Sequence, residues 1–96
     1  SSKNVAMVFT KSRNKDELLI GFSVSKKVAN AVGRNKVRRK MRENIRLMID
    51  DITPGHRIIF IARKNAANSE YLELGNQIRK LLKKAKLSGV SEDAKQ

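Results

Sequence analysis

Two of the short apolar runs in this chain predict neighbouring β-strands near its beginning. The runs Val5–Thr10 and Leu18–Ser25 are rich in β-forming residues. The polar stretch Lys11–Glu17 between them has a length and composition that suit an antiparallel hairpin. Gly21 interrupts the second run, so we expect a β-bulge or the close approach of another backbone there.

A third apolar run follows a predicted helix. It lies within His56–Arg63, where the continuous apolar centre Ile58–Ala62 predicts a central strand that is buried on both faces. The helix before it begins at about Arg34, with Asn35 as its expected N-cap, and Thr53-Pro54-Gly55 ends it. Its apolar stripe repeats at spacings of three and four and consists of Val37, Met41, Ile45, Met48 and Ile52.

A second helix completes the predicted fold. Ser69 is its expected N-cap and Gly89 its stop signal, and its core stripe is Leu74, Ile78, Leu81, Leu82 and Ala85. The element order β-β-α-β-α predicts an α+β fold, a two-layer sandwich of a small mixed sheet and helices. We expect a single domain over residues 1–88 and a polar tail over 89–96 that is disordered.

The net charge of the chain indicates the kind of partner that it binds. The chain has 96 residues and a formal charge of +13, and a field of that sign attracts polyanions. It has no cysteine, which excludes disulfides and thiolate metal sites, and no apolar run of the length a membrane span needs. We therefore expect a nucleic-acid-binding protein with RNA as its partner and no membrane partner.

The cations concentrate on the first predicted helix. Seven of the thirteen residues from 34 to 46 are basic, and Glu43 is the single acid among them. Arg38, Arg42 and Arg46 are four residues apart, so they form a row along one helix face. A merely solvated face mixes charges of both signs, so this face favours contact with phosphates. The predicted RNA-binding residues are Arg34, Asn35, Lys36, Arg38, Arg39, Arg42 and Arg46.

A second group of cations follows two of the predicted strands. Lys26 and Lys27 follow the second strand, and Arg63 and Lys64 follow the third. If these strands are parallel neighbours, the four cations converge at one end of the sheet; independent charges that protect strand ends are the alternative. Phe9, at the end of the first strand, has a ring that can stack on a base, although a core position is the commoner role of phenylalanine.

No arrangement of residues in the sequence predicts catalysis by the protein itself. His56 is the single histidine and lacks a partner for a nucleophilic pair. Asp50 and Asp51 offer oxygen ligands for Mg²⁺ near RNA, but solvation at a helix end is the simpler interpretation. We expect any catalysis to come from a partner. The rival interpretations are a general or ribosomal RNA-binding protein, a self-sufficient nuclease and a basic protein of membrane surfaces.

The longest motif, Gly21–Arg39, resembles the signature of the bacterial ribonuclease P protein subunit. It reads GFSVSKKVANAVGRNKVRR, against a family pattern of roughly G-[IVL]-S-V-S-K-K-x-G-N-A-V-x-R-N-R-x-[KR]-R. The stretch Ile59–Ala66 is similar to a later strand of that family, which ends I-A-R-x-x-A. The likeness implies a protein cofactor of an RNA enzyme that removes the 5′ leader from precursor tRNA, in the cytoplasm, with Mg²⁺ held by the RNA.

The resemblance also implies a division of the site. The family's Arg-Asn-Arg region contacts the catalytic RNA, and it corresponds here to Arg34, Asn35, Lys36, Arg38, Arg39 and Arg42. A cleft beside the sheet holds the single-stranded leader of precursor tRNA, and by position it would be lined by Phe9, Lys26, Lys27, Arg63 and Lys64. The family fold, which is like a domain of a ribosomal protein, carries a left-handed β-α-β crossover around the basic helix, against the usual rule.

The chain departs from the family pattern in three places. Lys36 and Ala29 stand where the family usually has arginine and glycine. Family members also begin with a basic segment and a helix bearing aromatic residues, whereas this chain begins near the point where that helix and its following strand should have ended. We expect an open sheet edge as a result, and with it dimerisation or edge pairing.

Overall fold

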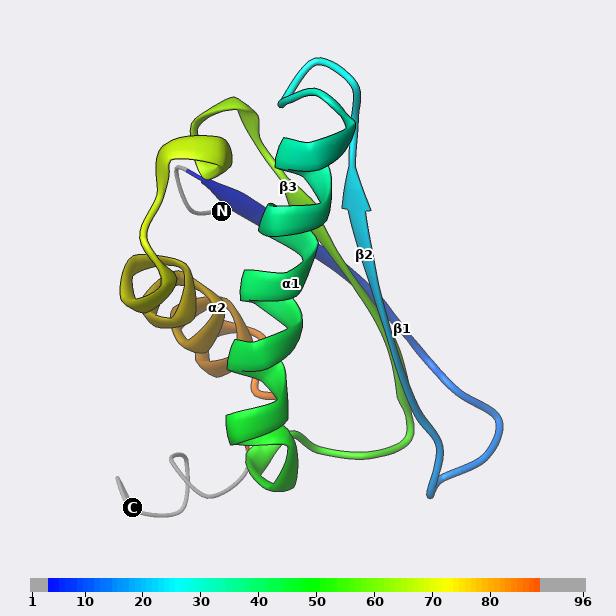
Figure 1. Cartoon of the computed structure of the whole chain (residues 1–96). Helices are drawn as coiled ribbons and strands as arrows, with labels where there is room; N and C mark the ends of the chain where they lie inside the picture. Colours follow the sequence, from blue (N-terminus) through cyan, green and yellow to red (C-terminus); the bar gives the residue numbers. More distant parts are fainter. Residues whose placement is uncertain (1–3, 89–96) are drawn as a thin grey trace.

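The computed structural model describes residues 4–88 and contains three strands and two long helices (Figure 1). The chain runs β1 (Val5–Lys11), β2 (Leu18–Val24), α1 (Ala31–Met48), the 3₁₀ turn η1 (Ile49–Asp51), β3 (His56–Ala62), the 3₁₀ turn η2 (Lys64–Asn68) and α2 (Tyr71–Lys84). The order β-β-α-β-α and the α+β class are as predicted from the sequence.

The sheet has the order β1-β3-β2, so the predicted hairpin of the first two strands is wrong. The central strand β3 is antiparallel to β1, with Val5 opposite Ala62, and parallel to β2, with Val24 opposite Ala62. Gly55, which precedes β3 and has a φ of +87°, enters the β1–β2 connection by accepting from Ser12 N and donating to Glu17 O. The connection is therefore held open around the start of β3 instead of closing into a tight turn.

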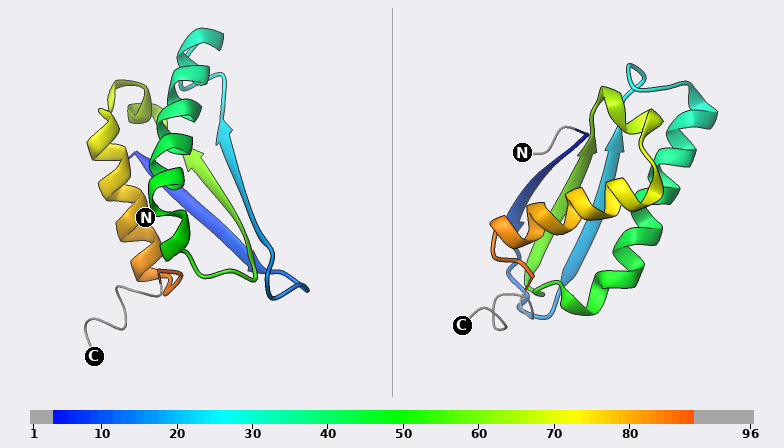
Figure 2. Two further views of the ribbon diagram at one scale, coloured as in Figure 1. Left: turned by 60° about the horizontal axis from the view of Figure 1, so that its bottom comes forward. Right: turned by 90° about the vertical axis from the view of Figure 1, so that its left-hand side faces the viewer.

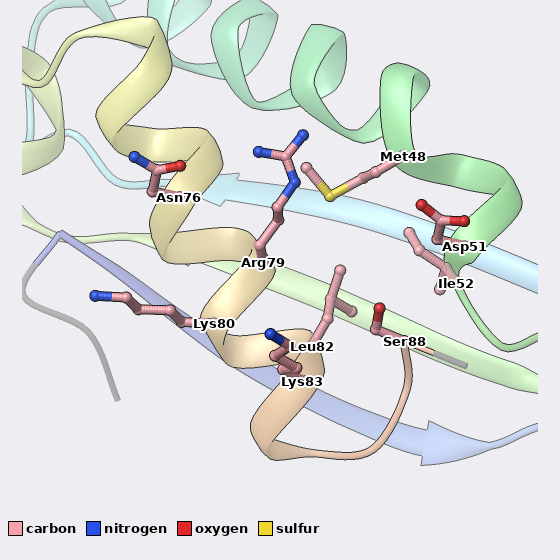
Figure 3. Close-up of a pocket in the computed structure, with 9 residues that line it drawn as sticks. All are labelled: Met48, Asp51, Ile52, Asn76, Arg79, Lys80, Leu82, Lys83 and Ser88. Atoms are coloured by element: carbon pink, nitrogen blue, oxygen red, sulfur yellow. The ribbon is translucent and has the colours of Figure 1, made fainter. Parts of the chain in front are cut away.

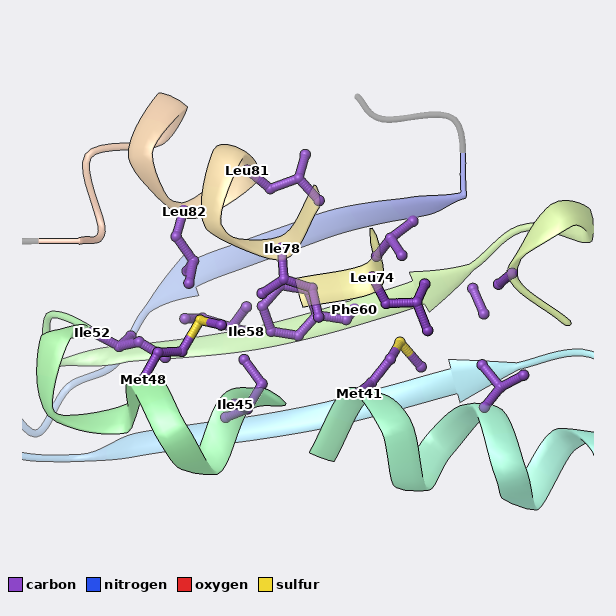
Figure 4. Close-up of a cluster of buried hydrophobic side chains, with 14 of the residues drawn as sticks. Met41, Ile45, Met48, Ile52, Ile58, Phe60, Leu74, Ile78, Leu81 and Leu82 are labelled. Carbon is purple, nitrogen blue, oxygen red and sulfur yellow. The ribbon is translucent and has the colours of Figure 1, made fainter. Parts of the chain in front are cut away.

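Both helices pack on the same face of the sheet, as the two views of Figure 2 show. The core lies between these two layers, where Ile58 and Phe60 of β3 meet Met41 of α1 and Ile78 of α2 (Figure 4). No helix or strand of the described part of the chain covers the opposite face. On it, Ile59 is 45% exposed, so the prediction that both faces of β3 are buried is wrong.

The connection from β2 through α1 to β3 is left-handed. In Figure 1 β2 and β3 both rise, α1 descends in front of the sheet, and β3 lies to the left of β2. With the helix in front, the usual right-handed crossover would place the second strand to the right. The left-handed crossover that the family resemblance implied is therefore present.

Local hydrogen bonds correct two predicted helix caps. Asn30, not Asn35, caps α1, because its side-chain oxygen accepts from Gly33 N at 2.8 Å; Asn35 lies inside the helix. The Ser69 hydroxyl does not cap α2. It donates to Asn65 O at 3.0 Å and accepts from the buried Asn4 side-chain amide.

The sequence also predicts local features at two glycines, Gly21 and Gly89. The register of β2 against β3 continues through Gly21 without a bulge, and a Cβ there would lie 3.8 Å from Ile59, an ordinary contact. The end of α2 is a Schellman turn in which Lys86, with a φ of 62°, takes the usual place of glycine and Leu87 N bonds to Leu82 O. The expected stop at Gly89 and the tail over 89–96 lie outside the described residues.

Candidate nucleic-acid interface

The basic face of α1 is fixed by the burial of its other face. Val37, Met41 and Ile45 are at most 5% exposed because they pack into the core. At 100° per residue, this places Arg38, Arg42 and Arg46 in a row on the flank of the helix that faces β2. The row of arginines is therefore held by a rigid helix, so an RNA phosphate chain would meet it without ordering a loop.

Most of these cations remain available to a ligand. The Arg34 guanidinium donates to Ala29 O and the Lys40 ammonium to Ser69 O, so both side chains help hold α1 in place. Arg38 donates to Asn35 Oδ1 at 3.2 Å, a bond between two side chains of the same helix. Within residues 4–88, no acidic side chain pairs with a cation of α1; the ion pair of Arg57 with Glu17 lies on the sheet.

A groove runs between this arginine row and β2. It has a volume of about 390 Å³, and Arg42 and Arg46 lie along it. The other lining residues are apolar: Leu18, Ile20, Phe22, Ile45 and Ile49. Phe22 stacks on the buried Phe60 with ring centroids 6.1 Å apart. Sequence reasoning did not select Phe22, and its alternation with Ile20 along β2 was the signal that both would share the helix-covered face with α1.

The cations that follow β2 and β3 converge as predicted, because the two strands are parallel and end together. Lys27, Arg63 and Lys64 line one hollow of about 570 Å³ at this end of the sheet, with Ser25, Val28 and Ala62. Lys26 is exposed in the same turn but does not line the hollow. The turn is held by bonds from Lys27 N to Ser25 Oγ and from Val28 N to Ser25 O.

The structure does not bring Phe9 to these four cations. Because β1 is antiparallel, Val5 lies opposite Ala62 at the cationic end and Phe9 lies opposite Ile58, further toward the other end of β3. The Phe9 ring is 42% exposed and meets the His56 ring edge-on. It faces a hollow beside α2, lined also by Met7, Leu81, Lys84 and Ala85.

Glu17 shows how the few acids of the chain are used. Its carboxylate accepts from the Ser12 hydroxyl, and this bond, helped by the Arg57 guanidinium, holds the pKa of Glu17 below its ordinary value. Within the described residues, no group of three or more histidine, aspartate or glutamate side chains has the arrangement to hold a metal ion. Neither helix in that part of the chain is long and apolar enough to cross a membrane.

A cationic helix face beside an apolar groove, together with a cationic sheet edge, defines a small basic α+β protein that binds nucleic acid. The family model for ribonuclease P matches residues 1–86. The chain therefore belongs to the ribonuclease P protein family.

Curated relatives and solved structures agree with this assignment. The ribonuclease P protein component of Alkaliphilus metalliredigens is 38% identical over 86 residues, which cover 90% of this chain and 78% of that protein. The component from Staphylococcus haemolyticus is 42% identical over 81 residues, which cover 84% and 70%. The structure of the Staphylococcus aureus RNase P protein aligns with a TM-score of 0.82 at 34% identity, covering 93% of this chain and 81% of that one.

Proposed function

We propose that this chain is the protein component of ribonuclease P, and that it binds the catalytic RNA and assists the 5′ maturation of tRNA in the cytoplasm. The observation that carries the proposal is the row of Arg38, Arg42 and Arg46, which no acidic side chain of the described residues neutralises. Guanidinium groups fork phosphate oxygens in pairs, and a row of them on one helix matches the repeating phosphates of an RNA strand.

The two cationic surfaces divide the work. The face of α1 contacts the catalytic RNA through Arg34, Asn35, Lys36, Arg38, Arg39, Arg42 and Arg46. The sheet end, with Lys26, Lys27, Arg63 and Lys64, holds the single-stranded leader of precursor tRNA. The apolar groove beside Arg42 extends from the arginine row to β2, so an unpaired base of the catalytic RNA is able to pack there on Phe22.

The protein's contribution to the reaction is electrostatic. Catalytic RNA and precursor tRNA repel one another through their phosphates, and a cationic protein between them lowers that repulsion. The chemistry of cleavage belongs to the RNA, which would also hold the Mg²⁺. The chain's cations replace part of the divalent ion that the RNA would otherwise need to bring its substrate close.

Reconstitution tests this proposal directly. The protein is added to a bacterial catalytic RNA and precursor tRNA at low Mg²⁺, where the RNA alone is slow, and release of the leader is measured. We expect a large increase in cleavage at low Mg²⁺ and little effect at high Mg²⁺. An equal rate with and without the protein at low Mg²⁺ would remove the proposal.

The protein alone with precursor tRNA and Mg²⁺ is the necessary control. This control matters because a solved variant of the Staphylococcus aureus protein, which aligns with 91% of this chain, is described as having defective mRNA degradation activity. We expect no cleavage without the catalytic RNA; cleavage would assign the reaction to the protein. Pull-down followed by RNA sequencing separates the role from general RNA binding, since one processing RNA should dominate.

Edge pairing of the sheet is a further part of the proposal. β1 and β2 are the two edge strands, and each pairs only with β3 within residues 4–88. An unpaired strand edge is a template for another chain, so two copies should associate as the concentration rises. Sedimentation equilibrium over a range of concentrations measures this association, and a monomer throughout would contradict it.

A further inference from the structure

Another hollow, on the helix side of the molecule, lies where the end of α1 meets α2 (Figure 3). It has a volume of about 320 Å³. Its lining residues come from both helices, from η1 and from the segment after α2: Met48, Asp51, Ile52, Asn76, Arg79, Lys80, Leu82, Lys83 and Ser88. None of them belongs to the two surfaces described above.

The wall of this hollow is built by backbone hydrogen bonds. The Schellman turn at Lys86 reverses the chain, and Leu87 O then accepts from Thr53 N at 2.7 Å. A β-bridge joins Ile52 to Ser88, which brings the end of the described chain against the segment after α1. The hollow is therefore preformed, because both of its sides are tied together across a long sequence separation.

The floor of the hollow is apolar and its rim is cationic. Met48, Ile52 and Leu82 are at most 4% exposed and form part of the core. In Figure 3 the side chains of Met48 and Arg79 extend toward one another, whereas Lys80 points away. Within the described residues, the side chains of Arg79 and Lys83 make no hydrogen bond or ion pair, so both cations are available to an anionic ligand.

The favourable position of cations at a helix C-terminus explains only part of this arrangement. The helix dipole attracts Lys83 and Lys84 equally, since they are neighbours in the last turn. It gives no reason for an apolar floor beneath Arg79 and Lys83, with Asp51 and Asn76 at the rim. An apolar surface beside cations and a few polar groups suits one nucleotide, whose base would pack on the floor and whose phosphate would meet the cations.

We propose that this hollow binds one nucleotide of a single-stranded RNA segment. Arg79 and Lys83 hold the phosphate, and the base lies on Met48, Ile52 and Leu82. The Asp51 carboxylate accepts hydrogen bonds, so it favours a base with an amino group over uracil. The rim is net cationic, with Arg79 and Lys83 against Asp51, and the volume is at the lower end of ligand pockets, which suits one nucleotide. The inference rests on the proposed function only in that the chain works on RNA.

The experiment measures binding of a five-nucleotide RNA of adenines, and of a matching RNA of uracils, at physiological salt. Methyl NMR of Met48, Ile52 and Leu82 reports the hollow directly. Lys83→Glu and Lys84→Glu are the matched pair, because they make the same charge change in the same helical turn; Lys83 lines this hollow, whereas Lys84 lines the separate hollow that Phe9 faces. We expect Lys83→Glu to weaken binding about tenfold, equivalent to about 1.4 kcal/mol, and Lys84→Glu by less than about twofold.

Three other outcomes would overturn the inference. Equal losses in the two variants would mean that only the overall field acts. Shifts of the same methyls with inorganic phosphate alone, unchanged by adding the RNA, would reduce the hollow to an anion site. Shifts that disappear when Arg38 and Arg42 are both changed to glutamate would mean that the signal comes from α1.

The same double variant separates this inference from the proposed function. We expect the variant to lose the catalytic RNA and to keep the methyl shifts caused by the adenine RNA. The wild-type protein could show the methyl shifts with adenine RNA and yet fail to accelerate cleavage. That result would support the hollow as an RNA site and contradict only the ribonuclease P role.

Discussion

Asn44 of α1 occupies the space that a side chain at Gly75 of α2 would need. Its amide nitrogen donates to Lys40 O at 2.9 Å and to Tyr71 O at 3.0 Å, so this buried side chain joins the two helices. A Cβ on Gly75 would lie 2.9 Å from Asn44 Cγ. The pair therefore fixes where α2 crosses α1, and with it the position of Arg79 relative to Met48.

Gly75→Ala should destabilise the protein because the new methyl group displaces the Asn44 amide from its hydrogen bonds. We expect a loss of about 1–3 kcal/mol in the free energy of unfolding, the usual cost of overpacking a core. Urea unfolding followed by circular dichroism measures it. Gly21→Ala is the control, since its Cβ meets only Ile59 at 3.8 Å, and it should change stability by less than about 0.5 kcal/mol.

Reversing Arg38 and Arg42 to glutamate should weaken binding to the catalytic RNA much more than binding to a leader oligonucleotide. Wild-type affinity for the catalytic RNA should fall with salt at a log–log slope of about −4, as expected for roughly five neutralised phosphates, and the variant's slope should be shallower. Fluorescence anisotropy from low to high salt gives both values.

The control for this charge change is Arg13→Glu with Lys15→Glu. These residues are exposed in the β1–β2 connection and carry the same total charge, but they lie away from α1. Equal losses of affinity in the two double variants would contradict a specific role for the arginine row.

Sulfate should stabilise the fold because it reduces repulsion among the cations of a chain with a net charge of +13. We expect the melting temperature to rise by roughly 5 °C or more, which for a domain of this size corresponds to about 1 kcal/mol. Chloride at the same ionic strength separates anion binding from screening. The same melting temperature in both salts would show that screening alone is responsible.

The loop that holds Gly55 should become less stable in acid, because Glu17 is protonated there. The pKa of Glu17 is lowered in the folded protein, chiefly by the Ser12 hydroxyl and then by Arg57. The stabilisation that ionised Glu17 gives the folded protein is therefore complete above the pKa that Glu17 has in the unfolded chain. It is lost as the pH falls through the lower pKa that Glu17 has in the folded protein. Carboxyl ¹³C NMR should show Ser12→Ala raising the titration midpoint of Glu17; an unchanged midpoint would contradict this role of the hydroxyl.

The sequence predicted the elements well because their signals are periodic. The stripe of Val37, Met41 and Ile45 identified the buried face of α1, and the cations then had only the opposite face to occupy. The convergence of Lys27 with Arg63 was also predictable. Two neighbouring parallel strands that are joined by a helix end at the same end of the sheet.

The errors concern partners that are distant in the sequence. A turn-like stretch between two strands does not reveal that Gly55 enters it, so the hairpin was predicted where β3 intervenes. Phe9 was grouped with Lys27 on the family resemblance alone; the antiparallel direction of β1 places Phe9 further along β3, and its role in leader binding stays a prediction. Asn30 and Asn35 are both acceptable caps by type, and only the hydrogen bond to Gly33 N distinguishes them.

The central position of β3 has a consequence for how the molecule forms. Among the residues from 4 to 88, β1 and β2 have no strand partner until β3 lies between them, so this sheet cannot begin from a local hairpin. During synthesis β1, β2 and the arginine-bearing α1 leave the ribosome before β3, so their strands stay unpaired with β3 until residues 56–62 follow. Pairing across such separations slows folding, and it leaves the cationic helix exposed before its scaffold exists. An RNA that meets the nascent chain at that stage would act as a template for folding as well as a partner.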